Sequence, residues 1–126
     1  MDKKGIGAAG EAAAERYLAD SGFQIIFRNY RMKYGEIDLI VRKGRDLRFI
    51  EVKSSIFHEA TFFTPEIRVN ARKIRKLKQL CEAYLLETHA PQDQLWQIDV
   101  ISVILNEDFA PRSINHIENA IFERKY

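Results

Sequence analysis

The chain has 126 residues, of which 46% are hydrophobic and 30% are charged, and its formal net charge is +2. This balance excludes a disordered protein, and no apolar run approaches the roughly 20 residues of a membrane span. The net charge is too small to indicate nucleic-acid binding by itself, so the distribution of charge matters more. A chain of this length predicts one domain, residues 1–126, with one modest core.

The N-terminus and the cysteine content predict a cytoplasmic protein. The segment "MDKKGIGAAGEAAAERYL" carries two lysines, but glutamates interrupt it before an apolar signal-peptide core can form. Cys81 is the lone cysteine, so no internal disulfide forms, which fits a reducing compartment. We therefore expect a cytoplasmic location and no membrane partner.

The first half of the chain predicts a helix followed by three strands. Residues 8–22, "AAGEAAAERYLADSG", are rich in helix formers and end in a glycine that suits a C-terminal cap. Residues 23–32, "FQIIFRNYRM", are dense in β-branched and aromatic residues, which is typical of a strand. Residues 36–42, "EIDLIVR", and residues 47–53, "LRFIEVK", are predicted to be the two arms of a β-hairpin.

The second half predicts a loop, a long helix and a strand. Residues 56–65 are expected to form the loop, and residues 66–89 the helix, because apolar residues recur there at spacings of three and four. Residues 95–105, "LWQIDVISVIL", read as a strand, whereas residues 113–126 suit either a short helix or an edge strand. The element order is therefore αβββαβ.

This order predicts an α/β (α+β) fold with a mixed sheet flanked by helices. Three strands so close in sequence can form an antiparallel meander, and the long helix can cross over so that the last strand joins the same sheet in parallel.

The hairpin register brings two carboxylates together. A two-residue turn at Gly44–Arg45 pairs residues whose numbers sum to 89, so Asp38 falls opposite Glu51, and Glu36 opposite Lys53. Alternation puts Glu36, Asp38 and Ile40 on one face of the first arm, with Ile37, Leu39 and Val41 on the other. In the second arm Phe49, Glu51 and Lys53 share one face, with Ile50 and Val52 on the other.

Two adjacent carboxylates repel each other unless a cation lies between them. Mg²⁺ suits this arrangement, because it takes one or two protein carboxylates together with waters and a substrate phosphate. The carbonyl of Val52 could complete the ligand set, and Lys53 could orient an attacking water or neutralise developing charge. The alternative is a cross-strand cluster of salt bridges on a solvated face, with Lys53 pairing Glu36 and Glu51.

The long predicted helix carries a run of positive charge opposite its apolar face. Only Glu66 is acidic before Glu82, and the basic residues are Arg68, Arg72, Lys73, Arg75, Lys76 and Lys78. Such a face could bind backbone phosphates, which supply most non-specific affinity for nucleic acids. The alternative is an ordinary solvated face. Arg28 and Arg31 could extend the patch.

Two further acidic residues are expected to be structural. Glu15 is expected to pair with a nearby Arg or Lys on the surface, and Asp99, within an apolar strand, is expected to be a satisfied carboxylate or a residue at the sheet edge.

Several stretches together resemble a known family. "GEIDLI" and "FIEVK" resemble the PD-(D/E)xK nuclease superfamily, and with "GAAGEAAAERYLADSGFQIIFRNYR" and "IDVISV" the chain is similar to the YraN-type family of small bacterial endonuclease-like proteins. The resemblance covers Gly5 to about Val103. It implies a restriction-endonuclease-like core of order αβββαβ, shared with archaeal Holliday-junction resolvases.

Carried over residue by residue, the resemblance implies a catalytic set of Asp38, Glu51, Lys53 and Glu11. Asp38 and Glu51 match the metal-binding carboxylates, Lys53 matches the lysine of (D/E)xK, and Glu11 matches a glutamate on the first helix that can reach the metal. The implied function is an Mg²⁺- or Mn²⁺-dependent DNA endonuclease, acting on branched or structured DNA, as a homodimer or with a recombination or DNA-processing partner. The alternative is a nucleic-acid-binding module that keeps the nuclease fold without turnover.

Overall fold

The computed structural model describes residues 3–58 and 71–120 of the chain. These residues form two helices and five strands in the order αβββαββ, which are α1 Lys3–Asp20, β1 Gln24–Met32, β2 Gly35–Lys43, β3 Asp46–Ile56, α2 Ala71–Glu87, β4 Leu95–Leu105 and β5 Pro111–Ile117. The expected loop beyond His58, the start of the long helix with Arg68, and the last residues of the tail lie outside the described residues. In the described ranges, neither helix combines the length and the apolar composition that crossing a membrane requires.

Helix α1 begins five residues earlier than the sequence predicts, and it ends at the predicted cap. Gly22 has φ of 92°, and the N–H of Phe23 donates to the carbonyl of Leu18 at 2.9 Å, as in a glycine-capped helix end. Gly10 faces β3 so closely that an added Cβ would lie 1.7 Å from the Ser54 hydroxyl. This glycine therefore lets α1 lie directly on β3, and it brings the neighbouring Glu11 close to that strand.

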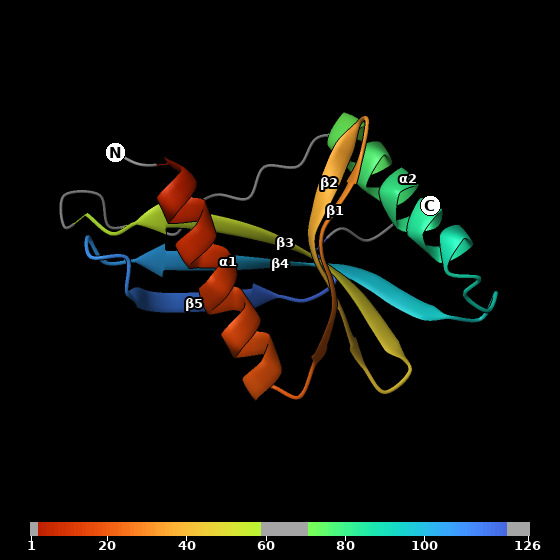
Figure 1. Ribbon diagram of the computed structural model, residues 1–126, viewed down its shortest axis with the longest axis horizontal. Coiled ribbons are helices and arrows are strands. Elements are labelled where there is room, and N and C mark those ends of the chain that lie inside the picture. The colour runs from red at the N-terminus through yellow and green to blue at the C-terminus, as the bar shows by residue number, and fades with distance from the viewer. Residues whose placement is uncertain (1–2, 59–70, 121–126) are drawn as a thin grey trace.

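The sheet is mixed, with strands in the order β1-β2-β3-β4-β5. Strands β1, β2 and β3 form the expected antiparallel meander, and β4 joins β3 in parallel after α2. Strand β5 adds an antiparallel edge strand that the sequence had left ambiguous. The predicted mixed sheet with flanking helices is confirmed, and the arrangement is compatible with a nuclease-like core (Figure 1).

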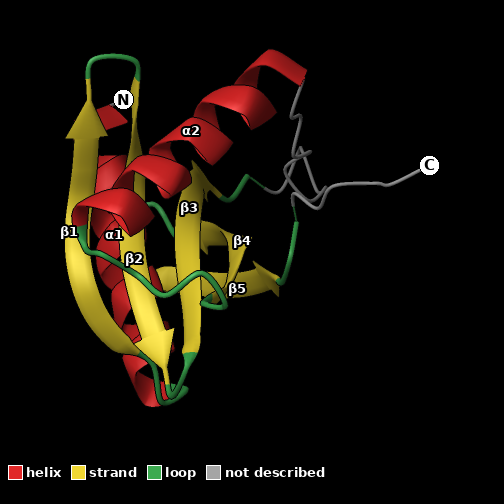
Figure 2. Cartoon of the chain, turned by 90° about the vertical axis from the view of Figure 1, so that its right-hand side faces the viewer, coloured by secondary structure: helices red, strands yellow, loops and turns green. Residues whose placement is uncertain are grey.

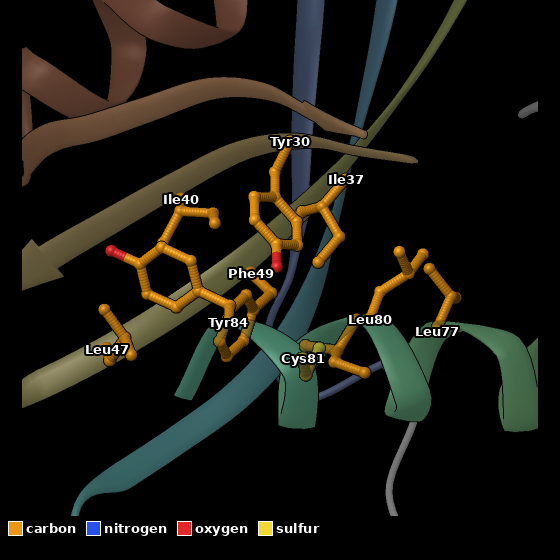
Figure 3. Packing of buried hydrophobic residues seen from close by; sticks show 10 residues of the cluster. Tyr30, Ile37, Ile40, Leu47, Phe49, Leu77, Leu80, Cys81 and Tyr84 are labelled. Atoms are coloured by element: carbon orange, nitrogen blue, oxygen red, sulfur yellow. The ribbon is translucent and has the colours of Figure 1, made fainter. Parts of the chain in front are cut away.

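Each helix covers a different face of the sheet, so two apolar clusters form (Figure 2). Leu18 of α1 packs with Leu39, Ile50 and Ile101 on one face. On the other face, α2 supplies an apolar stripe, whose members Leu77, Leu80, Cys81 and Tyr84 pack against residues of β1 to β4 (Figure 3). The period of the stripe predicted this packing of α2.

Candidate metal and phosphate site

The candidate site begins where β2 and β3 part. Their ladder keeps the predicted register, because the numbers of paired residues sum to 89 from Lys43–Asp46 to Leu39–Ile50. The ladder ends at Leu39–Ile50, although both strands continue beyond it. Figure 1 shows the end of the β1–β2 hairpin, drawn in orange, rising beside α2 while β3 runs on beside β4. The expected direct pairing of Asp38 with Glu51 is thus replaced by a gap between the strands.

The carboxylate of Asp38 lies in this gap. The backbone N–H of Val52 donates to Asp38 Oδ2 at 2.8 Å, so a side chain accepts the bond that a strand carbonyl would otherwise accept. The N–H and C=O of one residue in an extended strand point to the same edge. The carbonyl of Val52 therefore points toward the same gap, where the sequence had proposed it as a ligand.

Strand β2 also changes the face to which its side chains point at Asp38. Ile37 packs with Ile40 in the cluster under α2, whereas Leu39 and Val41 pack in the cluster under α1. The expectation that Ile37 shares a face with Leu39 and Val41 is therefore wrong. The physical reason is that Ile37 is buried against α2 once this end of the hairpin has left β3, which breaks the strict alternation at Asp38.

The surroundings of Asp38 disfavour its charge. Burial raises its pKa to about 6, and the charges of Glu11, Glu36 and Glu51 add to this rise, against the hydrogen bond from Val52, which lowers the pKa. The carboxylates that the sequence singled out therefore lie near enough to repel one another. A cation bound among them would relieve this repulsion.

Glu51 uses its two carboxylate oxygens differently. Oε1 forms ion pairs with two ammonium groups, Lys73 Nζ at 2.8 Å and Lys53 Nζ at 3.3 Å. Oε2 is buried and stands out among the described side chains as a buried polar atom without a hydrogen-bond partner. A buried carboxylate oxygen left without a partner costs about 1–3 kcal/mol, so an ion or water is the expected missing partner.

Glu11 and Glu36 flank Asp38 from different elements. Burial raises the pKa of Glu11, and the charges of Glu36 and Glu15 raise it further, while Arg31 lowers it. Glu11 and Val52 both line a cavity of about 530 Å³ between α1 and β3. Glu36 accepts from Arg31 Nε at 2.6 Å, so the expected pairing of Glu36 with Lys53 is wrong, because the ladder ends before it reaches them.

A second cluster, of two carboxylates and an imidazole, lies on β4, on β5 and at the residue after β5. Ligand atoms of Asp99, His116 and Glu118 lie within 4.8 Å of one another, and in the part of the chain that the structure describes no other such set of three occurs. This group could therefore hold a metal ion. However, Arg48 Nη1 donates to both Asp99 and Glu118, so a guanidinium already supplies the positive charge there.

The residues proposed to bind phosphates divide into two groups. Arg72 and Arg75 are exposed on α2 and Lys76 is half-buried, so these three remain available to a ligand, while Arg68 lies outside the described residues. Lys73 instead points to Glu51, at the carboxylate site. Arg28 and Arg31, proposed as an extension of the patch, form ion pairs with Glu15 and Glu36.

Two features differ from what the sequence predicts or lie beyond it. The sequence predicts Lys73 on the outer basic face, although this residue lies four residues before Leu77 and eight before Cys81, on the buried stripe of the helix. A chain of hydrogen bonds runs from Asp99 through His116 to Tyr17. It joins β4 and β5 to α1, which is far from them in sequence, so no local sequence pattern indicates it. The structural interpretations of Glu15 and Asp99 agree with their observed partners.

Comparison with known proteins gives one consistent result. The model of the family described as "Uncharacterised protein family UPF0102" matches residues 10–103. A UPF0102 protein of Nocardia farcinica is 37% identical over 121 residues, covering 96% of this chain and 91% of the relative. Those of Moorella thermoacetica and Alkaliphilus oremlandii are 37% and 39% identical, each covering 95% of this chain and 98% or more of the relative. The chain therefore belongs to the UPF0102 (YraN) family.

Proposed function

We propose that the protein is a metal-dependent endonuclease that hydrolyses phosphodiester bonds in DNA in the cytoplasm. The observation that carries this proposal is the unpaired, buried Oε2 of Glu51 beside Asp38, a carboxylate crowded by three others. A carboxylate cluster that served stability alone would be expected to have each buried oxygen satisfied.

The donor types suit a hard divalent cation. The oxygens of Asp38, Glu51 and Glu11 do not all lie within 4.8 Å of one another, so binding would draw them together. Asp38 and Glu51 would hold it, with the carbonyl of Val52 and, from α1, the carboxylate of Glu11. All four donors are oxygens, and Mg²⁺ and Mn²⁺ prefer oxygen ligands. When bound, such an ion lowers the pKa of a coordinated water and stabilises negative charge on a phosphate.

The protein's own residues orient the reaction. Lys53, whose ammonium lies 3.3 Å from Glu51 Oε1, orients the attacking water and offsets charge on the phosphate. The water oxygen bonds to phosphorus, its proton leaves to solvent, and the bond from phosphorus to one sugar oxygen breaks as that oxygen gains a proton. Arg72, Arg75 and Lys76 bind flanking phosphates and hold the strand in register.

The proposed phosphate contacts and the family resemblance indicate which kind of DNA the protein would cut. Phosphate contacts carry no base information, so selection by the shape of the DNA is expected rather than selection by its sequence. The resemblance to resolvases favours branched or structured DNA, and cutting two strands favours a homodimer.

Cleavage of labelled DNA tests the proposal. Duplex, single-stranded, flap and four-way-junction DNA would be incubated with the protein in Mg²⁺, Mn²⁺ or EDTA. We expect metal-dependent cleavage that Asp38→Asn and Lys53→Met each reduce by about 100-fold or more. Glu15→Gln is the matched control, since Glu15 pairs with Arg28 on the surface, and it should cut like the native protein. Absence of cleavage in every metal would contradict the proposal.

A second candidate is a DNA-binding module without turnover. One observation favours it, namely that Glu51 Oε1 is already engaged by two lysines, which can neutralise the site without a metal. This candidate predicts equal DNA affinity in Mg²⁺ and in EDTA, and no product in either.

A further inference from the structure

Lys73 is an unexpected member of the carboxylate site. It lies on the same side of α2 as Leu77 and Cys81, both buried against the sheet, so its side chain leaves the helix on the packed face. Its ammonium contacts Glu51 Oε1 at 2.8 Å, closer than the 3.3 Å of Lys53. Burial alone would lower the pKa of Lys73, but its hydrogen bond to Glu51 and the nearby charges of Glu51 and Asp38 hold it above the ordinary value.

The charges of the four central groups cancel in the absence of a metal. Asp38 and Glu51 supply two negative charges when ionised, and Lys53 and Lys73 supply two positive ones. A divalent cation entering this balanced set leaves an excess of two positive charges. Moving one ammonium away from Glu51 reduces that excess, and an incoming phosphate offers the displaced ammonium a new anionic partner.

We propose that Lys73 and a divalent cation compete for Glu51, and that the displaced ammonium of Lys73 binds a non-bridging oxygen of the substrate phosphate. This inference rests on the proposed function, since it needs a metal at Asp38 and Glu51. Lys53 keeps its place on β3, two residues from Glu51, whereas Lys73 comes from a separate element and can turn away without disturbing the strand. Metal and DNA then strengthen each other's binding, because each favours the state in which Lys73 has left Glu51.

Calorimetric titration of the full chain with Mn²⁺, without DNA, tests the competition. Lys73→Met keeps the apolar length of the side chain and removes the competing ammonium, so it should bind Mn²⁺ about fivefold more tightly than the native protein. Lys78→Met is the matched control, because it removes the same charge from α2 at a position about 140° further round the helix. It should change the affinity by less than about twofold.

The outcomes separate the two proposals. If native protein binds Mn²⁺ and Lys73→Met binds it equally or more weakly, the competition is wrong while the metal site stands. If neither the native protein nor Lys73→Met binds Mn²⁺, the metal site itself is wrong and both proposals fail. Should Lys73→Met not fold, as judged by circular dichroism, Lys73→Gln gives the same comparison.

Binding of a fluorescent duplex in Ca²⁺ or in EDTA tests the second half of the proposal. Ca²⁺ is used as the probe because, like Mg²⁺, it is a hard cation that binds oxygen ligands. The native protein should bind DNA more tightly in Ca²⁺ than in EDTA, and Lys73→Met should lose at least about threefold of this gain. An equal gain in both proteins would show that Lys73 does not bind the phosphate.

Discussion

Asp38 on β2 and Asp99 on β4 are both aspartates among apolar strand neighbours, yet their surroundings shift the two pKa values in opposite directions. Asp99 is fully buried and accepts from Arg48, Gln97, His116 and the N–H of Asn119 at 2.7–3.1 Å. Burial would raise its pKa, but these four hydrogen bonds bring the pKa below its ordinary value. Asp38 accepts one backbone bond, faces three other carboxylates, and has its pKa raised to about 6.

Asp99 is a completed carboxylate, by which we mean that the folded chain supplies its counter-charge and its hydrogen-bond donors. Asp38 is an incomplete one, because the chain does not. The protein supplies Asp99 with its own cation, Arg48, whose side chain is only 13% exposed, so the metal-like spacing of Asp99, His116 and Glu118 serves an internal ion pair. Near Asp38 the fold leaves charge repulsion and the unpaired Oε2 of Glu51. The two lysines of the site contact Glu51 Oε1, so among the described residues neither Asp38 nor Glu51 Oε2 has a cation in direct contact, and both are suited to receive one from a ligand.

Removing the charge of Asp99 should have the largest effect. Asp99→Asn leaves the buried guanidinium of Arg48 without its closest buried anion, and we expect the free energy of unfolding to fall by about 3 kcal/mol. Urea denaturation at pH 7 measures this. Asp93→Asn is the surface control, since Asp93 is 79% exposed and lies 3.7 Å from Arg45, and it should unfold like the native protein. Equal stability of Asp99→Asn and native protein would contradict the account of Asp99 as a completed ion pair.

Removing the charge of Asp38 should have the opposite sign. The folded pKa of about 6 exceeds the ordinary 3.8, so ionisation at pH 7 costs the metal-free protein stability. Asp38→Asn cannot ionise and should therefore be more stable in EDTA, by up to about 3 kcal/mol. Adding Mn²⁺ should stabilise the native protein and leave the variant unchanged. A variant less stable than native protein in EDTA would contradict the account of an incomplete carboxylate.

The dependence on pH sharpens the contrast. For Asp38 the folded pKa is raised, so its favourable contribution is fully present below 3.8 and lost as pH rises through about 6. The stability gap between Asp38→Asn and native protein should open between pH 4 and pH 7. For Asp99 the folded pKa is lowered, so its contribution is present above 3.8 and lost as pH falls further. Urea denaturation of both variants across pH 3 to 7 checks the two windows, and a common window would contradict the contrast.

The smallest effect is expected on α1, where Glu11 and Glu15 stand one turn apart. Glu11→Gln should weaken Mn²⁺ binding about tenfold, because Glu11 is proposed as an accessory ligand. Glu15→Gln should leave it unchanged, since the Glu15 carboxylate is engaged with Arg28 at 2.9 Å. Calorimetry compares the two. Equal affinities would remove Glu11 from the metal site and leave Asp38 and Glu51 in place.

The sequence predicted the parts of this structure that depend on local patterns. Alternation and a two-residue turn were enough for the β2–β3 register, and the apolar period was enough for the packed face of α2. Strand β5 was ambiguous because "PRSINHI" is mostly polar and lies at an edge, where one neighbour rather than two determines its pairing.

What the sequence could not predict depends on contacts between distant elements. The ladder ends at Leu39–Ile50 because Ile37 is buried against α2, a helix more than thirty residues further along the chain. The same packing turns Lys73 toward Glu51. The sequence therefore predicts which residues form the candidate site, but not which carboxylates are paired with a cation and which have a raised pKa.

The most direct measurement is the titration of the Asp38 and Asp99 carboxyl carbons by NMR, with and without Mg²⁺. In metal-free protein we predict that Asp38 titrates near pH 6 and Asp99 below 3.8, and that Mg²⁺ moves the Asp38 titration to lower pH and leaves Asp99 unchanged. An Asp38 carboxyl that titrates below pH 4 without metal and does not respond to Mg²⁺ would contradict the central claim.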